Sequence, residues 1–230
     1  MCFTPIISLS TAILEWVLAL ILVAVFKKSR LTNLFAILLA LLGGYQFSEY
    51  MLCTTGNLIW VKFGFLCYTF LPAVGLHSIL NYFHTKKNLW LIYIIPLFFS
   101  IFSIIKSDFV LSGQCLEIFI QTSTLVNKSL LLGIPYALYY ILFILIAFII
   151  LWKAREKARN KVEKEIYLLE MVGIILMTIP TFILIMILPP LGILFPSILC
   201  HFAVLLAILF FTSAYLDEKK SIHKKFHKTI

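Results

Sequence analysis

The sequence predicts an all-α polytopic membrane protein: a bundle of seven transmembrane helices with its N-terminus outside and its C-terminus in the cytoplasm. Three observations predict it, namely composition, a series of long apolar runs and an uneven placement of basic residues. Hydrophobic residues make up 62% of the chain and charged residues 13%, and the mean hydropathy is +1.05. Soluble domains carry about 25% charged residues. The composition therefore indicates a chain that lies in a membrane.

Seven apolar runs follow one another from the N-terminus. Each has about the length that crosses ~30 Å of hydrocarbon as a helix. The runs cover residues 5–26, 34–55, 58–83, 89–106, 130–152, 166–188 and 192–216. Each is predicted to be helical, because lipid-exposed backbone must satisfy its own hydrogen bonds and the runs lack the alternation of barrel strands. The first run has no charge before Glu15, so we expect a retained span rather than a cleaved signal peptide.

The basic residues predict the orientation. Sixteen of the nineteen Lys and Arg fall in the segments after the first, third, fifth and seventh runs, which leaves Lys62, Lys106 and Lys128 for the other side. Short loops rich in Lys and Arg face the cytoplasm. We therefore expect a bundle over residues 1–216 and a basic cytoplasmic tail over residues 217–230. The net charge of +9 is explained by this topology and by anionic lipid, so the expected partner is the bilayer and not nucleic acid.

The second run is interrupted by the polar stretch GGYQFSEY, residues 43–50. Helical spacing places Tyr45, Gln46, Glu49 and Cys53 on one stripe. A carboxylate at this depth costs about 2.5 kcal/mol or more, so it normally faces a partner or water. We expect the stripe to face the bundle, and the two preceding glycines to let a neighbouring helix approach closely.

Two further ionisable residues lie within runs. Glu15 lies near the middle of the first run and His201 in the outer half of the last. We hypothesise that they converge with Tyr45, Gln46 and Glu49 on an outward-opening cavity that binds a small ligand or a proton. The alternative is that Gln46 and Glu49 only hydrogen-bond to neighbouring helices and hold the bundle in register.

No constellation of catalytic residues can be read from the sequence. It contains no P-loop, GxGxxG or GxSxG motif. A zinc site needs about three protein ligands, whereas the runs supply two histidines, His77 and His201, at different depths. The sequence therefore predicts a non-enzymatic protein without a metal or other cofactor.

Two cysteines are expected near the outer face. Cys53 lies at the end of the second run, and Cys115 lies in the long segment between the fourth and fifth runs. A disulfide between them would tie that segment to the second helix in an oxidising compartment. Unpaired thiols are the alternative.

Spans three to seven carry aromatic and proline residues at particular positions in their apolar pattern: Trp60-x-Lys62-Phe63, Phe70-Leu71-Pro72, Asn81-Tyr82-Phe83, Trp90, Pro135, Pro180, Phe195-Pro196 and Ala214-Tyr215-Leu216. In these positions the chain resembles the seven-transmembrane N-terminal sensor region of bacterial and archaeal histidine kinases. This resemblance implies a sensory module of a prokaryotic plasma membrane. In that family, a helix continuing from the last span carries the signal to a cytoplasmic effector.

The chain departs from this pattern after Leu216, where fourteen residues remain and no kinase follows. We therefore expect output through a separate cytoplasmic signalling partner, and the alternative is that the sequence is a fragment of a longer protein. The predicted contact surface is the charged inner loop, in particular Arg155, Lys157, Arg159 and Lys161, with the tail. The other interpretation of this surface is that it only sets topology and contacts lipid. The alternative function is a small seven-helix carrier for a small solute, coupled to protons.

Overall fold

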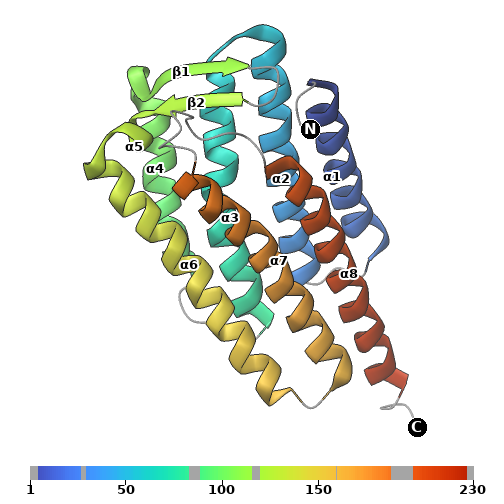
Figure 1. The fold of residues 1–230 in the computed structure, drawn as a ribbon. Coiled ribbons are helices and arrows are strands. Elements are labelled where there is room, and N and C mark those ends of the chain that lie inside the picture. The colour runs from blue at the N-terminus through green and yellow to red at the C-terminus, as the bar shows by residue number, and fades with distance from the viewer. Residues whose placement is uncertain are drawn as a thin grey trace.

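The computed structural model is a bundle of long helices with a short β-hairpin at one end (Figure 1). It describes residues 5–26, 30–82, 89–115, 120–158, 160–187 and 199–226. Within these ranges, side chains are not described for residues 30, 82, 181–187, 199–201 and 220–226. The long helices are α1 (Pro5–Val25), α2 (Arg30–Thr55), α3 (Ile59–Tyr82), α4 (Ile94–Ile105), α6 (Leu130–Lys157), α7 (Lys161–Ile187) and α8 (Leu199–Phe226).

Four helices in the described part of the chain are long and apolar enough to cross a bilayer. They cover Pro5–Val25, Leu31–Thr55, Ile59–Asn81 and Leu130–Lys157. A shorter apolar helical segment covers Leu89–Ile105 and joins the 3-10 turn η1 (Leu89–Tyr93) to α4. The chain is therefore a mostly helical, multi-pass membrane protein. Each of the seven predicted runs contains helix. Because α4, α7 and α8 are not among the four helices that are long and apolar enough to span a bilayer, seven crossings stay a prediction.

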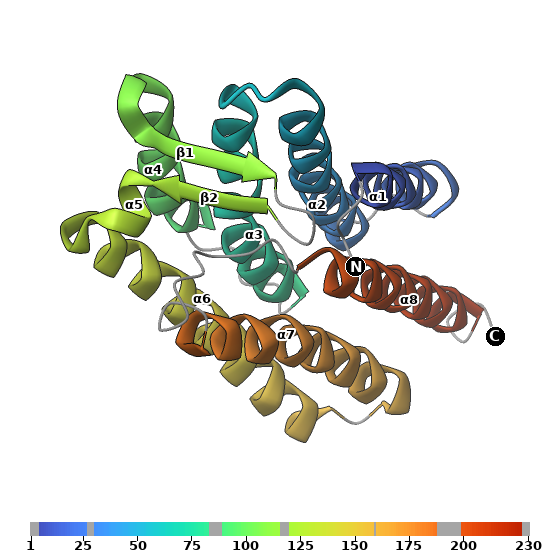
Figure 2. The ribbon, with the colours of Figure 1, turned by 45° about the horizontal axis from the view of Figure 1, so that its top comes forward.

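Helix α2 packs between α1 and α3, and it also contacts α8 (Figure 2). Apolar side chains of α1, α2, α3 and α8 form one core, in which Leu22, Leu39 and Ala207 have no exposed surface. A second core joins α3, α6 and α7 around Leu151 and Met171. These two cores place α3 in contact with both halves of the bundle.

The outward faces of α1, α4 and α6 are apolar and exposed. Large exposed side chains include Leu20 on α1, Phe98 on α4, and Ile141 and Ile149 on α6. Exposed apolar surface that extends over whole helices is rare in soluble proteins. In a bilayer these faces contact lipid chains, which agrees with the membrane class.

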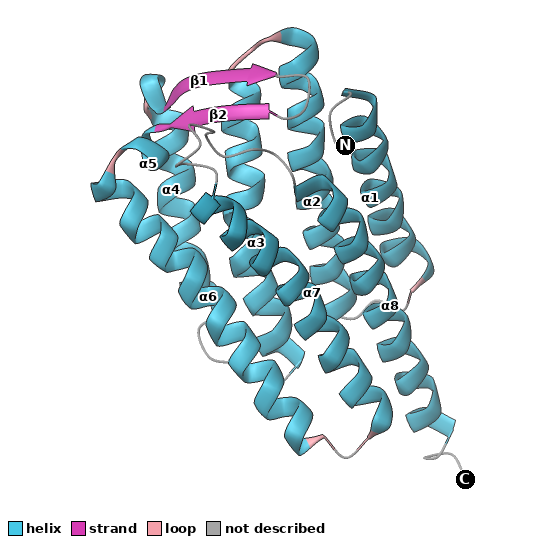
Figure 3. Cartoon of the chain, in the orientation of Figure 1, coloured by secondary structure: helices cyan, strands magenta, loops and turns pink. Residues whose placement is uncertain are grey.

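A β-hairpin occupies part of the segment that was expected to be a loop (Figure 3). Strand β1 (Val110–Cys115) pairs antiparallel with β2 (Ile120–Thr124), with Cys115 opposite Ile120 and a bulge between Val110 and Ser112. The short helix α5 (Leu125–Lys128) connects it to α6. The all-α prediction describes the bundle but misses this hairpin, because five or six residues are too few for alternation to stand out.

The hairpin is bonded covalently to α2. Cys53 and Cys115 form a disulfide with their Cα atoms 5.5 Å apart, across 62 residues of sequence. Their neighbours Leu52, Val61 and Ile120 form a small apolar cluster beneath the hairpin. The sequence had left this pairing open against free thiols, and the structure contains the bond.

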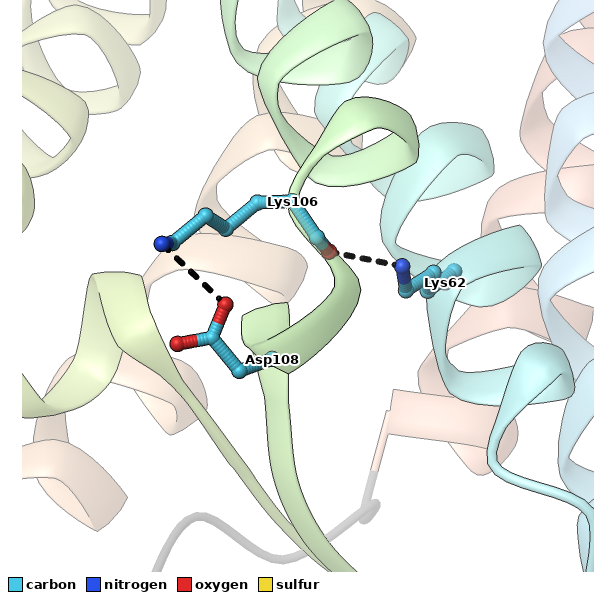
Figure 4. Close-up of polar contacts among 3 residues, drawn as sticks. All are labelled: Lys62, Lys106 and Asp108. Atoms are coloured by element: carbon cyan, nitrogen blue, oxygen red, sulfur yellow. Dashed lines mark hydrogen bonds and ion pairs between the residues drawn. The ribbon is translucent and has the colours of Figure 1, made fainter.

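Lysine side chains fix the junction between α4 and the hairpin (Figure 4). The ammonium of Lys62 on α3 donates to the carbonyl oxygen of Lys106 at 2.8 Å, and the ammonium of Lys106 lies 3.3 Å from Asp108 Oδ1. A cation beside the last carbonyls of a helix is favourable. The pKa of Asp108 is lowered by a hydrogen bond from its own backbone and by Lys106. Both side chains of the ion pair are at least half exposed, so the pair adds little stability.

A short turn joins α6 to α7 at the opposite end of the bundle (Figure 1). The Oδ1 atom of Asn160 accepts a hydrogen bond from the Val162 N–H at 3.0 Å and so caps α7. The predicted output residues Arg155, Lys157 and Lys161 are exposed here. Arg159 lies outside the described residues.

Helix α8 continues through the boundary that was expected between bundle and tail. It runs from Leu199 to Phe226, so residues 217–226 extend the helix of the bundle. The last four residues of the predicted tail, 227–230, lie outside the described residues.

Candidate functional site

Two acids and an amide are buried where α1 and α2 pack together. Glu15 and Gln46 have no exposed surface, and Glu49 is 5% exposed. Glu15 and Glu49 are close enough to interact electrostatically, and the interaction is repulsive when both are ionised. Gln46 lies one turn before Glu49 on the same face of α2. The structure thus gathers three of the five predicted site residues.

The polar atoms of this group are poorly satisfied. Among the described residues, neither carboxylate oxygen of Glu15 nor either amide atom of Gln46 has a hydrogen-bond partner. A buried polar group without a partner costs about 1–3 kcal/mol, and more when it is charged. A proton shared by the carboxyls, or a bound cationic group, would relieve both the missing hydrogen bonds and the repulsion.

The described helices around Glu15 and Gln46 are packed without an opening to solvent, since both side chains are fully buried. The sequence predicted a cavity that opens outward, but Glu15 and Gln46 are not exposed to such an opening in the structure. A proton needs little room, whereas a larger ligand could enter only if α1 moved away from α2.

Gly43 allows the close approach of α1. A Cβ atom at Gly43 would lie 2.6 Å from Cδ1 and Nε1 of Trp16 and 3.1 Å from the carbonyl oxygen of Ala12. The indole Nε1 of Trp16 donates to the carbonyl oxygen of Ala40 at 3.2 Å, and its ring packs on Phe47. Trp16 therefore sits beside Glu15 in the sequence and against the glycine of α2.

Gly44 allows the close approach of α3, on the other side of α2. A Cβ atom there would lie 2.8 Å from the sulfur of Cys67 on α3. The two consecutive glycines thus let α1 and α3 approach α2 from two sides, as the sequence predicted for one neighbouring helix.

We predict that Gly43→Ala destabilises the protein by about 1–3 kcal/mol, because the added methyl group forces Trp16 and the backbone of α1 outward. Thermal unfolding in detergent measures the effect. Gly75→Ala on α3 is the matched control, since a Cβ there meets nothing within 4 Å. Alanine is up to about 1 kcal/mol better than glycine in a helix. Equal melting temperatures for the two variants would contradict the close contact at Gly43.

The remaining two predicted residues are placed differently. The ring of Tyr45 packs edge-on against Tyr68 of α3, with 5.7 Å between ring centroids. This contact directs the Tyr45 ring toward α3. His201 belongs to α8, but its side chain lies outside those described, so its place in the site stays a prediction.

His77 is held by a local contact. Its Nδ1 atom forms a hydrogen bond of 2.7 Å with the hydroxyl of Tyr93, and the two rings meet edge to face. Within the described part of the chain, no three His, Cys, Asp or Glu residues are grouped so that they could hold a metal ion.

Sequence reasoning missed a third acid within the bundle, which is half-buried. Glu170 on α7 lines a small cavity together with Leu31 and Phe35 of α2, Ser78 of α3 and Leu151 of α6, and its Oε1 atom is shielded from solvent. Ser213 of α8 lies close enough to interact with it. The signal was present in the sequence, because Glu170 falls inside the sixth apolar run.

Sequence reasoning also missed three tyrosines of α6, Tyr136, Tyr139 and Tyr140. All three hydroxyls hydrogen-bond to α3 near Pro72. The signal was their spacing, which places them on one face of a helix.

No protein-family model, curated protein or solved structure matches the chain. The similarity to the sensor region of histidine kinases therefore rests on the sequence pattern alone.

Proposed function

We propose that this chain is a non-enzymatic signal-input module of a prokaryotic plasma membrane, with seven membrane-spanning helices. It receives an extracellular or membrane-borne cue at Glu15, Gln46 and Glu49 and passes it to a separate cytoplasmic partner. The observation that carries this proposal is the burial of two carboxyls and an unsatisfied amide between α1 and α2. Such groups are costly inside a membrane protein, and their usual use is to bind a proton, an ion or a substrate.

The charge distribution supports an outside N-terminus and a cytoplasmic C-terminus. Lys62 and Lys106 lie at the hairpin end, where Lys62 donates to the backbone carbonyl of Lys106 and Lys106 forms an ion pair with Asp108. The exposed basic side chains of the α6–α7 turn lie at the other end, together with the C-terminal end of α8 (Figure 1). Positive side chains concentrate on the cytoplasmic side of membrane proteins.

The α6–α7 turn and the end of α8 are the surface proposed for the cytoplasmic partner. Arg155, Lys157 and Lys161 are exposed, and they are interspersed with acidic residues such as Glu165. An exposed surface of mixed charge suits a protein partner whose charges are complementary. The helical extension of α8 beyond residue 216 adds a second element at the same end of the bundle (Figure 1).

A carrier for a small solute, coupled to protons, is the second candidate. The observation that favours it is Glu170, because this acid lines a cavity in the half of the bundle away from the hairpin. Carboxyls at two depths inside a bundle are typical of proton relays in transporters. A carrier would dissipate an imposed gradient in proteoliposomes faster than protein-free vesicles, whereas a sensor would leave the gradient intact.

We predict that protons change the environment of Trp16 and that Glu49→Gln abolishes this response. Glutamine keeps the shape and hydrogen-bonding atoms of the side chain but removes its charge. The measurement uses a variant in lipid nanodiscs that retains Trp16 as its single tryptophan. Its fluorescence is followed between about pH 4 and 9, a range that includes the pKa values of perturbed carboxyl groups.

Glu165→Gln, an exposed acid on α7, is the control and should respond like the parent protein. Glu49→Leu tests the alternative that Glu49 only holds neighbouring helices together. In that case leucine could replace it with little loss of stability. If the parent and Glu49→Gln melt alike and share one flat pH response, Glu49 is not the switch.

A further inference from the structure

Helix α3 contains a proline in its interior, Pro72. Proline has no N–H to donate, and its ring displaces the carbonyl four residues earlier in the helix. The carbonyl of Tyr68 therefore loses its partner within α3, and the carbonyl of Thr69 is next to it. Because an interior proline bends a helix, we call the segment from Tyr68 to Ala73 the Pro72 bend. In a membrane such carbonyls must find donors from another helix.

Helix α6 supplies those donors. The hydroxyl of Tyr140 donates to the carbonyl oxygen of Tyr68, and the hydroxyl of Tyr139 donates to that of Thr69 at 2.7 Å. The backbone of Ala73 also interacts with Tyr139, so this hydroxyl is placed between two backbone groups that are one turn apart in α3. The Tyr136 hydroxyl forms a hydrogen bond of 2.9 Å with the Thr69 side chain.

The same bend contacts α2 one residue before the candidate site. The ring of Tyr68 packs on that of Tyr45, which precedes Gln46 on α2. Helix α6 runs from Leu130 to Lys157, and its own interior proline, Pro135, precedes the three tyrosines. The stretch after Pro135 therefore connects the tyrosines to the exposed basic turn without a further proline. A continuous series of contacts thus runs from α2 through the bend of α3 to α6.

We propose that the Pro72 bend of α3, held by the hydroxyls of Tyr139 and Tyr140, is the element that passes a change at the Glu15–Glu49 site to the cytoplasmic end of α6. The role as a transmitter rests on the proposed function, whereas the link between α3 and α6 does not. When the angle of the bend changes, the Tyr68 carbonyl moves. Helix α6 then either moves with it or loses the hydrogen bond between Tyr140 and Tyr68. A contact of this kind has two discrete states, which is what transmission between distant sites requires.

A double-mutant cycle tests the link itself. Tyr140→Phe should lower the melting temperature clearly in the parent protein, because it leaves the Tyr68 carbonyl without a donor. In a Pro72→Ala background the same substitution should have a much smaller effect, because alanine restores the missing N–H. Tyr215→Phe, whose residue is 53% exposed, should change neither background. Equal losses from Tyr140→Phe in both backgrounds would overturn the link.

A second measurement tests transmission and does not depend on Pro72→Ala folding. Tryptophans are replaced by 5-fluorotryptophan, and the fluorine resonances of Trp16 beside the site and of Trp152 near the end of α6 are followed at constant pH. Glu49→Gln should shift both resonances. With Tyr140→Phe present, Glu49→Gln should still shift Trp16 but should shift Trp152 much less.

The outcomes separate the two proposals. An undiminished shift of Trp152 in the presence of Tyr140→Phe refutes transmission through the bend and leaves the proposed function standing. If Glu49→Gln shifts neither resonance, the proposed function fails, and with it the role as a transmitter. The double-mutant cycle then still decides whether α6 supports the bend of α3.

Discussion

A cysteine introduced at Asn127 is expected to react with a membrane-impermeant maleimide on intact cells, whereas one at Asn160 stays unlabelled until the membrane is permeabilised. Both residues are exposed, but Asn127 lies in α5 beside the hairpin and Asn160 in the turn between α6 and α7. These two places are at opposite ends of the bundle (Figure 1). A charged reagent does not cross ~30 Å of hydrocarbon, so the contrast should be nearly all or none.

Labelling is compared by gel shift or mass spectrometry. The chain without an added cysteine sets the background, and lysed cells should label both variants. Labelling of Asn160→Cys from outside would overturn the orientation and, with it, the proposal of a cytoplasmic partner at the α6–α7 turn.

Replacing both Cys53 and Cys115 with serine is expected to lower the free energy of unfolding by about 2–4 kcal/mol. The disulfide closes a long loop, with 62 residues of separation, and holds β1 against the end of α2. Without it, the hairpin depends on the small apolar cluster of Leu52, Val61 and Ile120. Because α3 and α4 in that loop stay helical in a membrane, we expect the lower part of this range.

Thermal unfolding with and without reductant measures the effect. The parent protein should melt at a lower temperature when reduced, and the doubly substituted protein should not respond to reductant. Identical melting of the oxidised parent and the double variant would show that the bond does not stabilise the fold.

The sequence predicted the positions of the helices well because apolar length decides them, but it predicted their ends poorly. Helix α7 begins at Lys161, several residues before its apolar run, because Asn160 caps it there. Helix α8 is described from Leu199 and continues to Phe226 through charged residues, ten residues past the end of its apolar run. Capping and helix propensity determine these ends, and neither depends on hydropathy.

The candidate site was predictable in part for a similar reason. Glu15, Gln46 and Glu49 stand out because each is polar within an apolar run, and such residues face the interior of a bundle. The roles of Tyr139 and Tyr140 could not be predicted, because periodicity assigns a face to a helix but does not say which neighbour that face meets. Pro72 required a donor from another helix, and only the packing of α6 on α3 identifies it.

The continuous course of α8 links the position of its C-terminal end to the tilt of its buried part. Small side chains, Ala203, Ala207 and Ala214, form much of its buried face, and Phe210 between them stacks on Phe35 of α2 with 5.4 Å between ring centroids. From Ala207 to Phe226 an α-helix extends about 28 Å. A tilt of about 10° around Ala207 would therefore move the far end of α8 by about 5 Å, since an unbroken helix has no joint at which the motion could be lost.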